Sequence, residues 1–222
     1  MKCIVTAGPT YEALDQVRRL TNLSTGRLGI GLASFLTDRG HDVTLLLGEQ
    51  ATWNGERRAQ HILVFGSTAD LSLRLEALSE LPADAVFHAA AVSDFQVGKV
   101  WEHRSDGELA ELSAGKISSR ISRLLVELLP TLKIIAFLRT WFPQAILTGW
   151  KYEVDGDRAA AIRQGKQQLA DCHTDACVVN GPAYGSGFGL VTPASRRTHL
   201  SEAPALYTAL ERRLRAPVKS QI

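Results

Sequence analysis

Short apolar runs alternate along the chain with stretches in which apolar residues recur at helical spacing. The runs predict buried strands, and the periodic stretches predict amphipathic helices. Strands are predicted at residues 2–6, 42–47, 85–91, 124–129, 145–151 and 176–180. Helices are predicted at residues 30–39, 68–81, 131–139, 157–171 and 203–215, and a hairpin at residues 188–200. This alternation predicts an α/β fold, with a doubly wound, mostly parallel, Rossmann-like sheet and helices on both faces.

Two parts of the pattern are weaker. Residues 96–119 are polar and contain three glycines, which predicts a flap or irregular excursion from the sheet. The run at residues 124–129 fits a strand or a helix by periodicity alone. Pro130 suits the first position of a helix, so we place a strand before it and a helix after it. Thr68 has a side chain suited to capping the helix that starts there.

The connection between the first predicted strand and the first predicted helix is unusually long. Residues 6–29 are rich in glycine and polar side chains, whereas such connections usually take only a few residues. Other polar signals also follow predicted strands: Gly8 follows the first, and Asp94, Glu153 and Asn180 follow later ones. Because the carboxyl ends of parallel strands meet at one edge of a sheet, these positions predict one shared ligand cleft.

Composition bounds the function further. With 222 residues, 45% of them hydrophobic, the chain can bury a substantial core as a single domain over residues 1–222. A net charge of +2, with scattered basic residues, indicates no nucleic-acid or membrane partner. We find no signal-peptide pattern and no apolar run long enough for a membrane span. The odd set of Cys3, Cys172 and Cys177 indicates reduced thiols and a cytoplasmic location.

Each candidate binding residue also has a purely structural interpretation. Asn22 suits a turn, and Arg18 suits an exposed loop as well as a carboxylate or phosphate ligand. Asp94 suits a helix cap, Lys116 a solvated surface position and Trp150 the core. The six histidines show neither metal-ligand nor catalytic-triad spacing, so we assign none of them a role.

Four separate motifs together resemble one enzyme family. They are Thr6-Ala7-Gly8-Pro9-Thr10 with Glu12, Asp15, Val17-Arg18, Asn22, Ser24-Thr25-Gly26 and Gly29; Ala89-Ala90-Ala91-Val92-Ser93-Asp94-Phe95; Gly149-Trp150 with Glu153; and Val178-Val179-Asn180. This pattern closely resembles phosphopantothenoylcysteine synthetase, the phosphopantothenate–cysteine ligase of coenzyme A biosynthesis, up to about residue 188. In bacteria this ligase is commonly fused behind a flavin-dependent decarboxylase. The chain begins at the ligase's first strand, so we expect no flavin and no decarboxylation.

The resemblance implies a reaction that needs an activated acid. Joining the carboxylate of 4'-phosphopantothenate to the amine of L-cysteine is uphill in water, so in this family the carboxylate first attacks the α-phosphate of a nucleotide. Bacterial members use CTP and eukaryotic ones ATP, with Mg²⁺ shielding the phosphates. Cysteine then displaces the nucleoside monophosphate. Such chemistry needs positioning and charge neutralisation more than a protein nucleophile.

By similarity, the long loop binds the acid. Asn22 holds the activated carboxylate or acyl-phosphate through its amide, and Arg18 lies near it. Ser24-Thr25-Gly26, with Gly29, offer hydroxyl and backbone donors to the phosphate of phosphopantothenate at the start of a helix. Gly8 opens the cleft.

The resemblance assigns the other motifs to the nucleotide. The backbone of Ala89-Ala90-Ala91 lies against the base, and Asp94 binds ribose hydroxyls or orients the metal. Trp150 stands where the family usually has phenylalanine near the base, and stacking survives that change. Asn180 also borders the nucleotide.

The chain departs from the family pattern in the flap. Bacterial members carry Lys-Ile-Lys-Lys there, whereas this chain has Lys116-Ile117-Ser118-Ser119, so at least one charge expected at the triphosphate is lost. Lys151, Lys166 or a flap-borne Lys116 can replace it. Tyr11 also replaces a common arginine, and Gly181-Pro182 replaces the usual Asp-Val.

Three functions therefore stay open: an active ligase, a catalytically weakened relative that still binds nucleotide or phosphopantothenate, and an NAD(P)-dependent reductase. The reductase needs a Gly-x-Gly-x-x-Gly turn and usually a Tyr-x-x-x-Lys pair, and the sequence has neither. Family members form homodimers in which the flap of one subunit approaches the other's site, so the resemblance also implies a homodimer.

Overall fold

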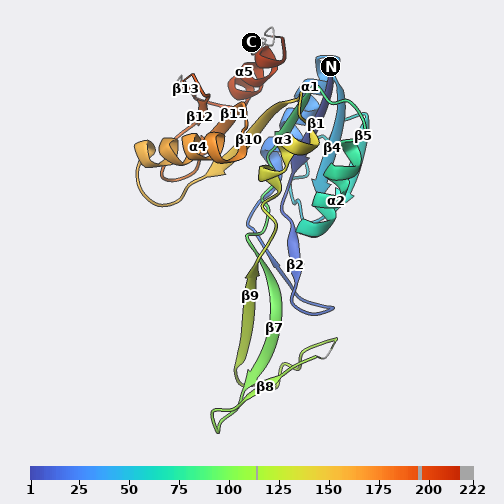
Figure 1. Ribbon diagram of the computed structural model, residues 1–222, viewed down its shortest axis with the longest axis vertical. Helices are drawn as coiled ribbons and strands as arrows, with labels where there is room; N and C mark the ends of the chain where they lie inside the picture. The colour runs from blue at the N-terminus through green and yellow to red at the C-terminus, as the bar shows by residue number, and fades with distance from the viewer. Residues whose placement is uncertain (114, 195–196, 216–222) are drawn as a thin grey trace.

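An eight-stranded sheet forms the body of the molecule (Figure 1). The computed structural model describes residues 1–113, 115–194 and 197–215. Neighbouring strands are parallel from β5 to β11, and a hairpin continues the sheet in antiparallel fashion. In spatial order the strands are β5 (His61–Phe65), β4 (Asp42–Gly48), β1 (Lys2–Ala7), β6 (Ala85–His88), β10 (Ile146–Tyr152), β11 (Ala176–Asn180), β12 (Phe188–Val191) and β13 (Arg197–Leu200). The predicted α/β fold with a mostly parallel sheet is confirmed.

Helices cover both faces of the sheet (Figure 1). One face carries α1 (Arg27–Asp38) and α5 (Ala203–Arg215). The other carries α2 (Thr68–Leu78), the 3₁₀ helix η1 (Ile134–Ala136), α3 (Leu138–Trp141) and α4 (Arg158–Cys172). Because β1 and β4 lie between the two layers, their sequences are apolar without alternation. Among the described helices, none is long and apolar enough to cross a membrane.

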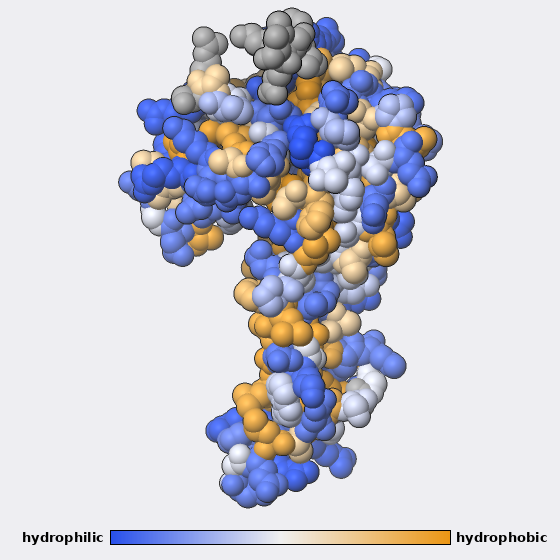
Figure 2. Space-filling model, in the orientation of Figure 1, coloured by the Kyte–Doolittle hydropathy of each residue, from blue (hydrophilic) through white to orange (hydrophobic). Residues whose placement is uncertain are grey.

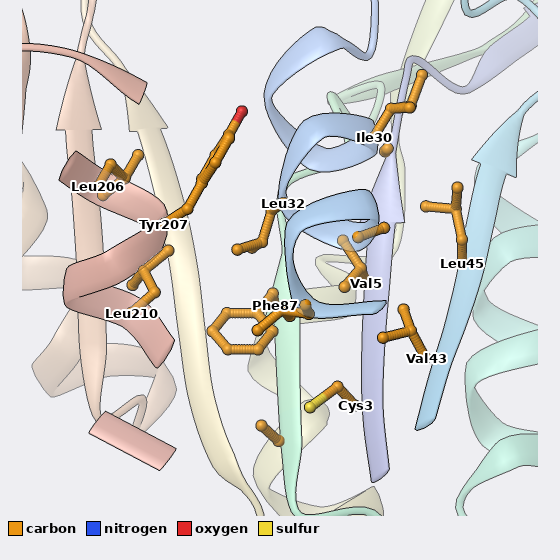
Figure 3. Close-up of a cluster of buried hydrophobic side chains, with 14 of the residues drawn as sticks. Cys3, Val5, Ile30, Leu32, Val43, Leu45, Phe87, Leu206, Tyr207 and Leu210 are labelled. Atoms are coloured by element: carbon orange, nitrogen blue, oxygen red, sulfur yellow. The ribbon is translucent and has the colours of Figure 1, made fainter. Parts of the chain in front are cut away.

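The core beneath α1 and α5 fixes the strands that carry the candidate site. Figure 3 shows Phe87 of β6 between Leu32 of α1 and Leu210 of α5, with Val5 of β1 beside α1. Each of these side chains is almost completely buried. Burial of such a side chain contributes about 1.5–3 kcal/mol, so β1 and β6 are firmly held.

The strand order reverses between β1 and β6. The chain passes from β1 to β4 on one side of β1 and later enters β6 on the other side. The connections therefore leave β1 and β6 in opposite directions, and in open α/β sheets ligands bind at this point, beyond the carboxyl ends of the strands. The loops that begin at Gly8 and Ala89 lie there.

Two small antiparallel sheets project from the body (Figure 1). The β2–β3 hairpin, made of β2 (Tyr11–Ala13) and β3 (Arg19–Thr21), belongs to the long loop after β1. The flap contains β7 (Phe95–His103), β8 (Leu109–Glu111) and β9 (Leu124–Pro130), in the order β8-β7-β9. The excursion predicted at residues 96–119 is thus a regular antiparallel sheet that extends to Pro130.

The prediction for residues 124–139 is partly wrong. The predicted strand is present as β9, but it pairs with β7 of the flap instead of joining the main sheet. The predicted helix is replaced by η1 and the four-residue α3. The reason lies at Thr131, whose N–H donates to Asp94 O (3.0 Å) and whose hydroxyl donates to Ser93 O. These bonds hold residue 131 against the start of β7, where it cannot begin a helix.

Three smaller differences concern element ends and an edge strand. Ser67, not Thr68, caps α2, because its Oγ accepts from Asp70 N (3.2 Å) and Thr68 is already helical. Helix α1 begins at Arg27, earlier than predicted. Strand β5 was not predicted, since it lies at the sheet edge with most of its residues exposed or half-buried.

Candidate functional site

The loops after β1 and β6 are joined by backbone hydrogen bonds and form the floor of the cleft. Ala91 N donates to Gly8 O (3.0 Å), and Thr10 N donates to Ala91 O (3.1 Å). Strand β6 ends at His88, earlier than the predicted strand at residues 85–91, but pairing with the chain after β1 continues as far as Ala91. The floor is therefore backbone with small side chains, which allows a ligand to approach closely.

Asn22 ties the long loop to this floor. It follows β3, and its Nδ2 donates to Ala91 O (3.3 Å) and Val92 O (3.0 Å). The side chain is exposed to solvent, and no hydrogen bond to its Oδ1 is present in the described residues. An exposed amide at the switch point of the sheet is well placed to meet a ligand.

Helix α1 begins shortly after Asn22 with an available anion site. Its first turn has no acidic residue, and the N-cap position is occupied by Gly26, with φ 78°. Ser24 is half-buried and Thr25 exposed. The helix lies directly on β1, since a Cβ at Gly29 would lie 2.6 Å from Ala7 Cβ. The positive end of the helix dipole and the two hydroxyls can therefore receive an anion at the cleft.

A cavity of about 330 Å³ opens at the carboxyl ends of β6 and β10, on the face that carries η1 and α4. Its lining includes His88, Ala90, Val92, Asp94, Lys133, Trp150, Lys151 and Gln168. Sequence reasoning missed His88, Lys133 and Gln168. The only sequence signal for His88 is that it directly precedes the alanine motif, and the other two lie in segments without a motif.

His88 lies at the bottom of this cavity with a fixed ring. Its Nδ1 is 3.0 Å from Thr6 Oγ1, which itself accepts from Ala90 N (3.1 Å). The Thr6 hydroxyl can donate to Nδ1, and the proton of the neutral ring is then on Nε2. Burial lowers the pKa of His88 to about 4, so the imidazole is neutral near pH 7.

Gln168 of α4 packs over β10 at a glycine. Its Nε2 donates to Trp150 O (3.2 Å), while its Oε1 is buried and has no hydrogen-bond partner among the described residues. A Cβ at Gly149 would lie 2.3 Å from that Oε1 and 2.6 Å from Ile135 Cδ1. Glycine at 149 therefore makes the room that the amide of Gln168 occupies.

Two lysines line the cavity, and two others do not. Lys151 Nζ lies 4.0 Å from Glu153 Oε1, and Lys133 enters from the segment after β9. Lys166 is exposed on α4, outside the lining, and Lys116 is exposed in the flap. The structure thus brings Lys133 and Lys151 together at the cavity.

Asp94 contributes a single carboxylate to the cavity. It directly precedes β7, so it does not cap a helix. Within residues 1–113, 115–194 and 197–215, no group of three or more His, Cys, Asp or Glu side chains can hold a metal ion. Mg²⁺ usually binds one or two carboxylates together with substrate phosphates. Asp94 therefore fits a Mg²⁺ ion that arrives with a nucleotide.

Of the two remaining predicted nucleotide residues, Trp150 lines the cavity and Asn180 does not. Side chains alternate along β10, so Trp150 points away from the face where Gln168 lies, and it packs against the core beneath α1. Its Nε1 is buried, with no hydrogen-bond partner in the described chain. Asn180 ends β11 outside the lining, and its carbonyl accepts from Glu153 N (2.9 Å). Stacking of a base on Trp150 stays a prediction.

The tip of the β2–β3 hairpin holds the flap segment that carries Lys116. Arg18 NH1 lies 2.8 Å from Asp15 Oδ2, and both terminal nitrogens of Arg18 donate to Ile117 O (3.1 Å each). Asp15 Oδ2 also accepts from Ile117 N (3.1 Å). Burial opposes ionisation of Asp15, but the backbone N–H groups and Arg18 outweigh it and lower its pKa.

These hydrogen bonds hold Arg18 at the hairpin tip, away from Asn22, although both are predicted site residues. Strand β3 lies between Arg18 and Asn22, and an extended chain rises about 3.3 Å per residue, which puts them about 13 Å apart. Within one chain, Arg18 and Lys116 therefore lie together at the hairpin tip, and the structure does not bring them to Asn22.

The sequence of the chain matches a known protein family. Residues 1–202 match the model of the DNA/pantothenate metabolism flavoprotein C-terminal domain family. The chain is 32% identical over 209 residues to the coenzyme A biosynthesis bifunctional protein CoaBC of Bacillus subtilis (strain 168), a match that covers 91% of this chain and 47% of that protein. The chain thus spans about half the length of this relative.

Solved structures share the fold. The DNA/pantothenate metabolism flavoprotein from Streptococcus pneumoniae superposes with a TM-score of 0.81 at 23% identity, covering 97% of this chain and 98% of that one. A Cab2 variant in complex with phosphopantothenate-cysteine superposes with a TM-score of 0.68 at 17% identity, covering 97% and 89%.

Proposed function

The chain belongs to the DNA/pantothenate metabolism flavoprotein C-terminal domain family, and from this membership we propose that it joins 4'-phosphopantothenate to L-cysteine, using a nucleoside triphosphate. The observation that carries the proposal is the amide of Asn22, set across Ala91 and Val92 between the start of α1 and the lysine-lined cavity. In this proposal the phosphate of the acid binds on the α1 side of this amide, and the nucleotide occupies the cavity of about 330 Å³ on the other side.

The reaction has two steps, and neither needs a protein nucleophile. A carboxylate oxygen of phosphopantothenate attacks the α-phosphorus of the nucleotide, the bond from that phosphorus to the bridging oxygen breaks, and pyrophosphate leaves. The cysteine nitrogen then attacks the acyl carbon, the acyl C–O bond breaks, the nucleoside monophosphate leaves, and the nitrogen loses a proton. The protein acts by aligning the groups and neutralising their charge.

The acid occupies the α1 side of the cleft. The phosphate of phosphopantothenate binds Ser24, Thr25 and the backbone at Gly26. Asn22 holds the carboxylate, and one of its N–H groups moves to the acid from Ala91 O, the longer of its two hydrogen bonds. This exchange keeps the bond to Val92 O, so the loop stays attached while the ligand binds.

The nucleotide, CTP or ATP, occupies the cavity on the other side. The backbone of Ala89-Ala90-Ala91 lies against the base, with Trp150 and Asn180 at its border. Asp94 binds the ribose or a Mg²⁺ ion, and the metal supplies charge neutralisation at the phosphates. The base lies at the inner end of the cavity, beside buried His88 and Gln168. The phosphates lie at its outer end, beside exposed Lys133 and half-buried Lys151.

A pyrophosphate-release assay with CTP and ATP in parallel tests the function. We expect pyrophosphate release that depends on both phosphopantothenate and the nucleotide, and phosphopantothenoylcysteine only when cysteine is present. If neither nucleotide gives a cysteine-dependent product, the ligase proposal fails. The second candidate, a weakened relative that only binds, is favoured by Ser118-Ser119 and by the distance of Lys116 from the cavity. It predicts nucleotide binding without pyrophosphate release.

Lys133 is expected to supply part of the positive charge at the triphosphate, because Ser118-Ser119 stand where bacterial family members have lysines. We predict that Lys133→Ala raises the KM for CTP about 10-fold, because a charge-assisted bond to a phosphate contributes roughly 1.5–3 kcal/mol. Lys2→Ala, at the opposite end of β1, is the matched control and leaves the KM unchanged. A raised KM in Lys166→Ala, with none in Lys133→Ala, would instead place the phosphates along α4.

The flap offers a surface for a second copy of the chain. Strand β9 is an edge strand whose side chains are largely apolar, and Leu125, Val126, Leu128 and Leu129 are all exposed. Figure 2 shows hydrophobic side chains along the narrow flap below the body. An exposed, apolar edge strand offers unpaired N–H and C=O groups to which another chain can pair. In a homodimer joined there, the hairpin tip with Arg18 and Lys116 serves the neighbouring subunit's cleft.

The pairing of flaps predicts a change of mass. We expect the chain to sediment as a dimer and the double variant Val126→Glu, Leu128→Glu to sediment as a monomer. In a dimer of the variant, the carboxylates on the two facing strands would repel one another and would lose their contact with water. Leu73→Glu, on the exposed side of α2, serves as control and stays dimeric. A dimer that survives the double variant would place the interface elsewhere.

A further inference from the structure

Two deeply buried polar side chains line the cavity, and each turns a polar atom to it. His88 and Gln168 are each only 6% exposed, and both line the cavity. Among the described residues, Gln168 Oε1 is buried without a hydrogen-bond partner, and the ring of His88 makes its hydrogen bond through Nδ1, to Thr6 Oγ1. Buried polar groups are usually paired, and an unpaired one at a cavity commonly meets a ligand.

The local contacts orient the Gln168 amide and leave Nε2 of His88 as the ring nitrogen available to a ligand. Gln168 cannot turn its amide over, because Trp150 O requires a donor and receives one from Nε2. Its oxygen must therefore remain the free group, above Gly149. Thr6 Oγ1 lies 3.0 Å from His88 Nδ1, and when its hydroxyl donates there the proton of the neutral ring is on Nε2. The cavity thus presents a fixed acceptor at Gln168 Oε1 and, in the Nε2–H tautomer, a donor at His88.

We propose that His88 and Gln168 select the base of the nucleotide, with Gln168 Oε1 accepting from an exocyclic amino group and His88 Nε2–H donating to the neighbouring ring nitrogen. Cytosine and adenine both present an amino group beside an unprotonated ring nitrogen. On the corresponding edge, uracil and guanine present a carbonyl oxygen beside a ring N–H, which sets acceptor against acceptor and donor against donor. The selection rests on the proposed function only in that a nucleotide occupies the cavity.

Nucleotide binding, measured by calorimetry without phosphopantothenate or cysteine, tests the selection. We expect CTP and ATP to bind at least about 10-fold more tightly than UTP and GTP, because a mismatched base leaves buried polar groups unpaired. In Gln168→Met, which keeps the side-chain length but removes the acceptor, the ratio of CTP to UTP affinity falls to within about 3-fold. Gln164→Met, on the exposed side of α4, keeps the wild-type ratio.

The ratio of CTP to UTP affinity is measured within one variant. A loss of affinity that is equal for all nucleotides therefore leaves this ratio unchanged. Equal binding of CTP and UTP by the wild-type chain overturns the selection without a mutant, and so does a wild-type ratio in Gln168→Met. Selective binding without ligation would refute the ligase function and leave the selection intact. Absence of binding by all four nucleotides would refute both.

Discussion

Replacement of Asn22 by aspartate is expected to lower kcat for phosphopantothenoylcysteine formation at least about 100-fold. The change removes two N–H donors and places a carboxylate against Ala91 O and Val92 O, where the donors now lie 3.3 and 3.0 Å away. It also adds negative charge beside the substrate's carboxylate. Loss of one donor at a centre of developing charge typically costs about 10²–10³ in kcat, and here the repulsion adds to that loss. Single-turnover measurements of pyrophosphate and product follow each step separately.

The controls separate chemistry from folding. Asn22→Ala removes the donors without adding charge, so we expect a smaller loss than in Asn22→Asp. Asn54→Asp adds the same charge on an exposed loop and leaves kcat unchanged. Wild-type kcat in Asn22→Asp would refute the role of this amide. Loss of the folded state in both Asn22 variants, seen by circular dichroism, would show that Asn22 serves only to tie the loop.

The fold could be predicted from the sequence where packing is uniform. Strands β1 and β4 are buried on both faces, so their apolar runs are continuous and easy to identify. Helix α4 has a clear beginning at Asp157, whose side chain accepts from Ala160 N (2.7 Å). The flap was harder to predict, because β9 is apolar for a reason other than burial in the body. Its role depends on pairing with β7, which is not encoded in its own periodicity.

In the candidate site, too, some residues could be predicted from local sequence and others could not. Asn22 and Asp94 lie in long local motifs, so the sequence alone singled them out. Lys133 reaches the cavity only because the bonds of Thr131 at the base of the flap hold the segment after β9 against the body. Gln168 reaches it only because residue 149 on the adjacent strand is glycine. Such residues are brought together by tertiary contacts, and single-sequence patterns carry no record of those contacts.

Acid is expected to destabilise the chain through His88. Burial lowers the pKa of His88 from 6.5 to about 4 in the folded state. Between these values the unfolded chain binds a proton that the folded chain does not, so the stabilisation is complete above pH 6.5 and is lost as the pH falls towards 4. At about 1.4 kcal/mol per pKa unit, the loss is about 3 kcal/mol. Urea unfolding at several pH values measures it.

A variant without the titrating ring isolates this contribution from that of the carboxylates. The wild-type free energy of unfolding should fall between pH 7 and pH 4 by about 3 kcal/mol more than that of His88→Gln. His61→Gln, at an exposed position on β5, should follow the wild-type curve at every pH. A constant difference between wild type and His88→Gln across this range would mean that the ring is protonated as readily in the folded chain as in the unfolded one. In that case burial would not keep the imidazole of His88 neutral at the bottom of the cavity.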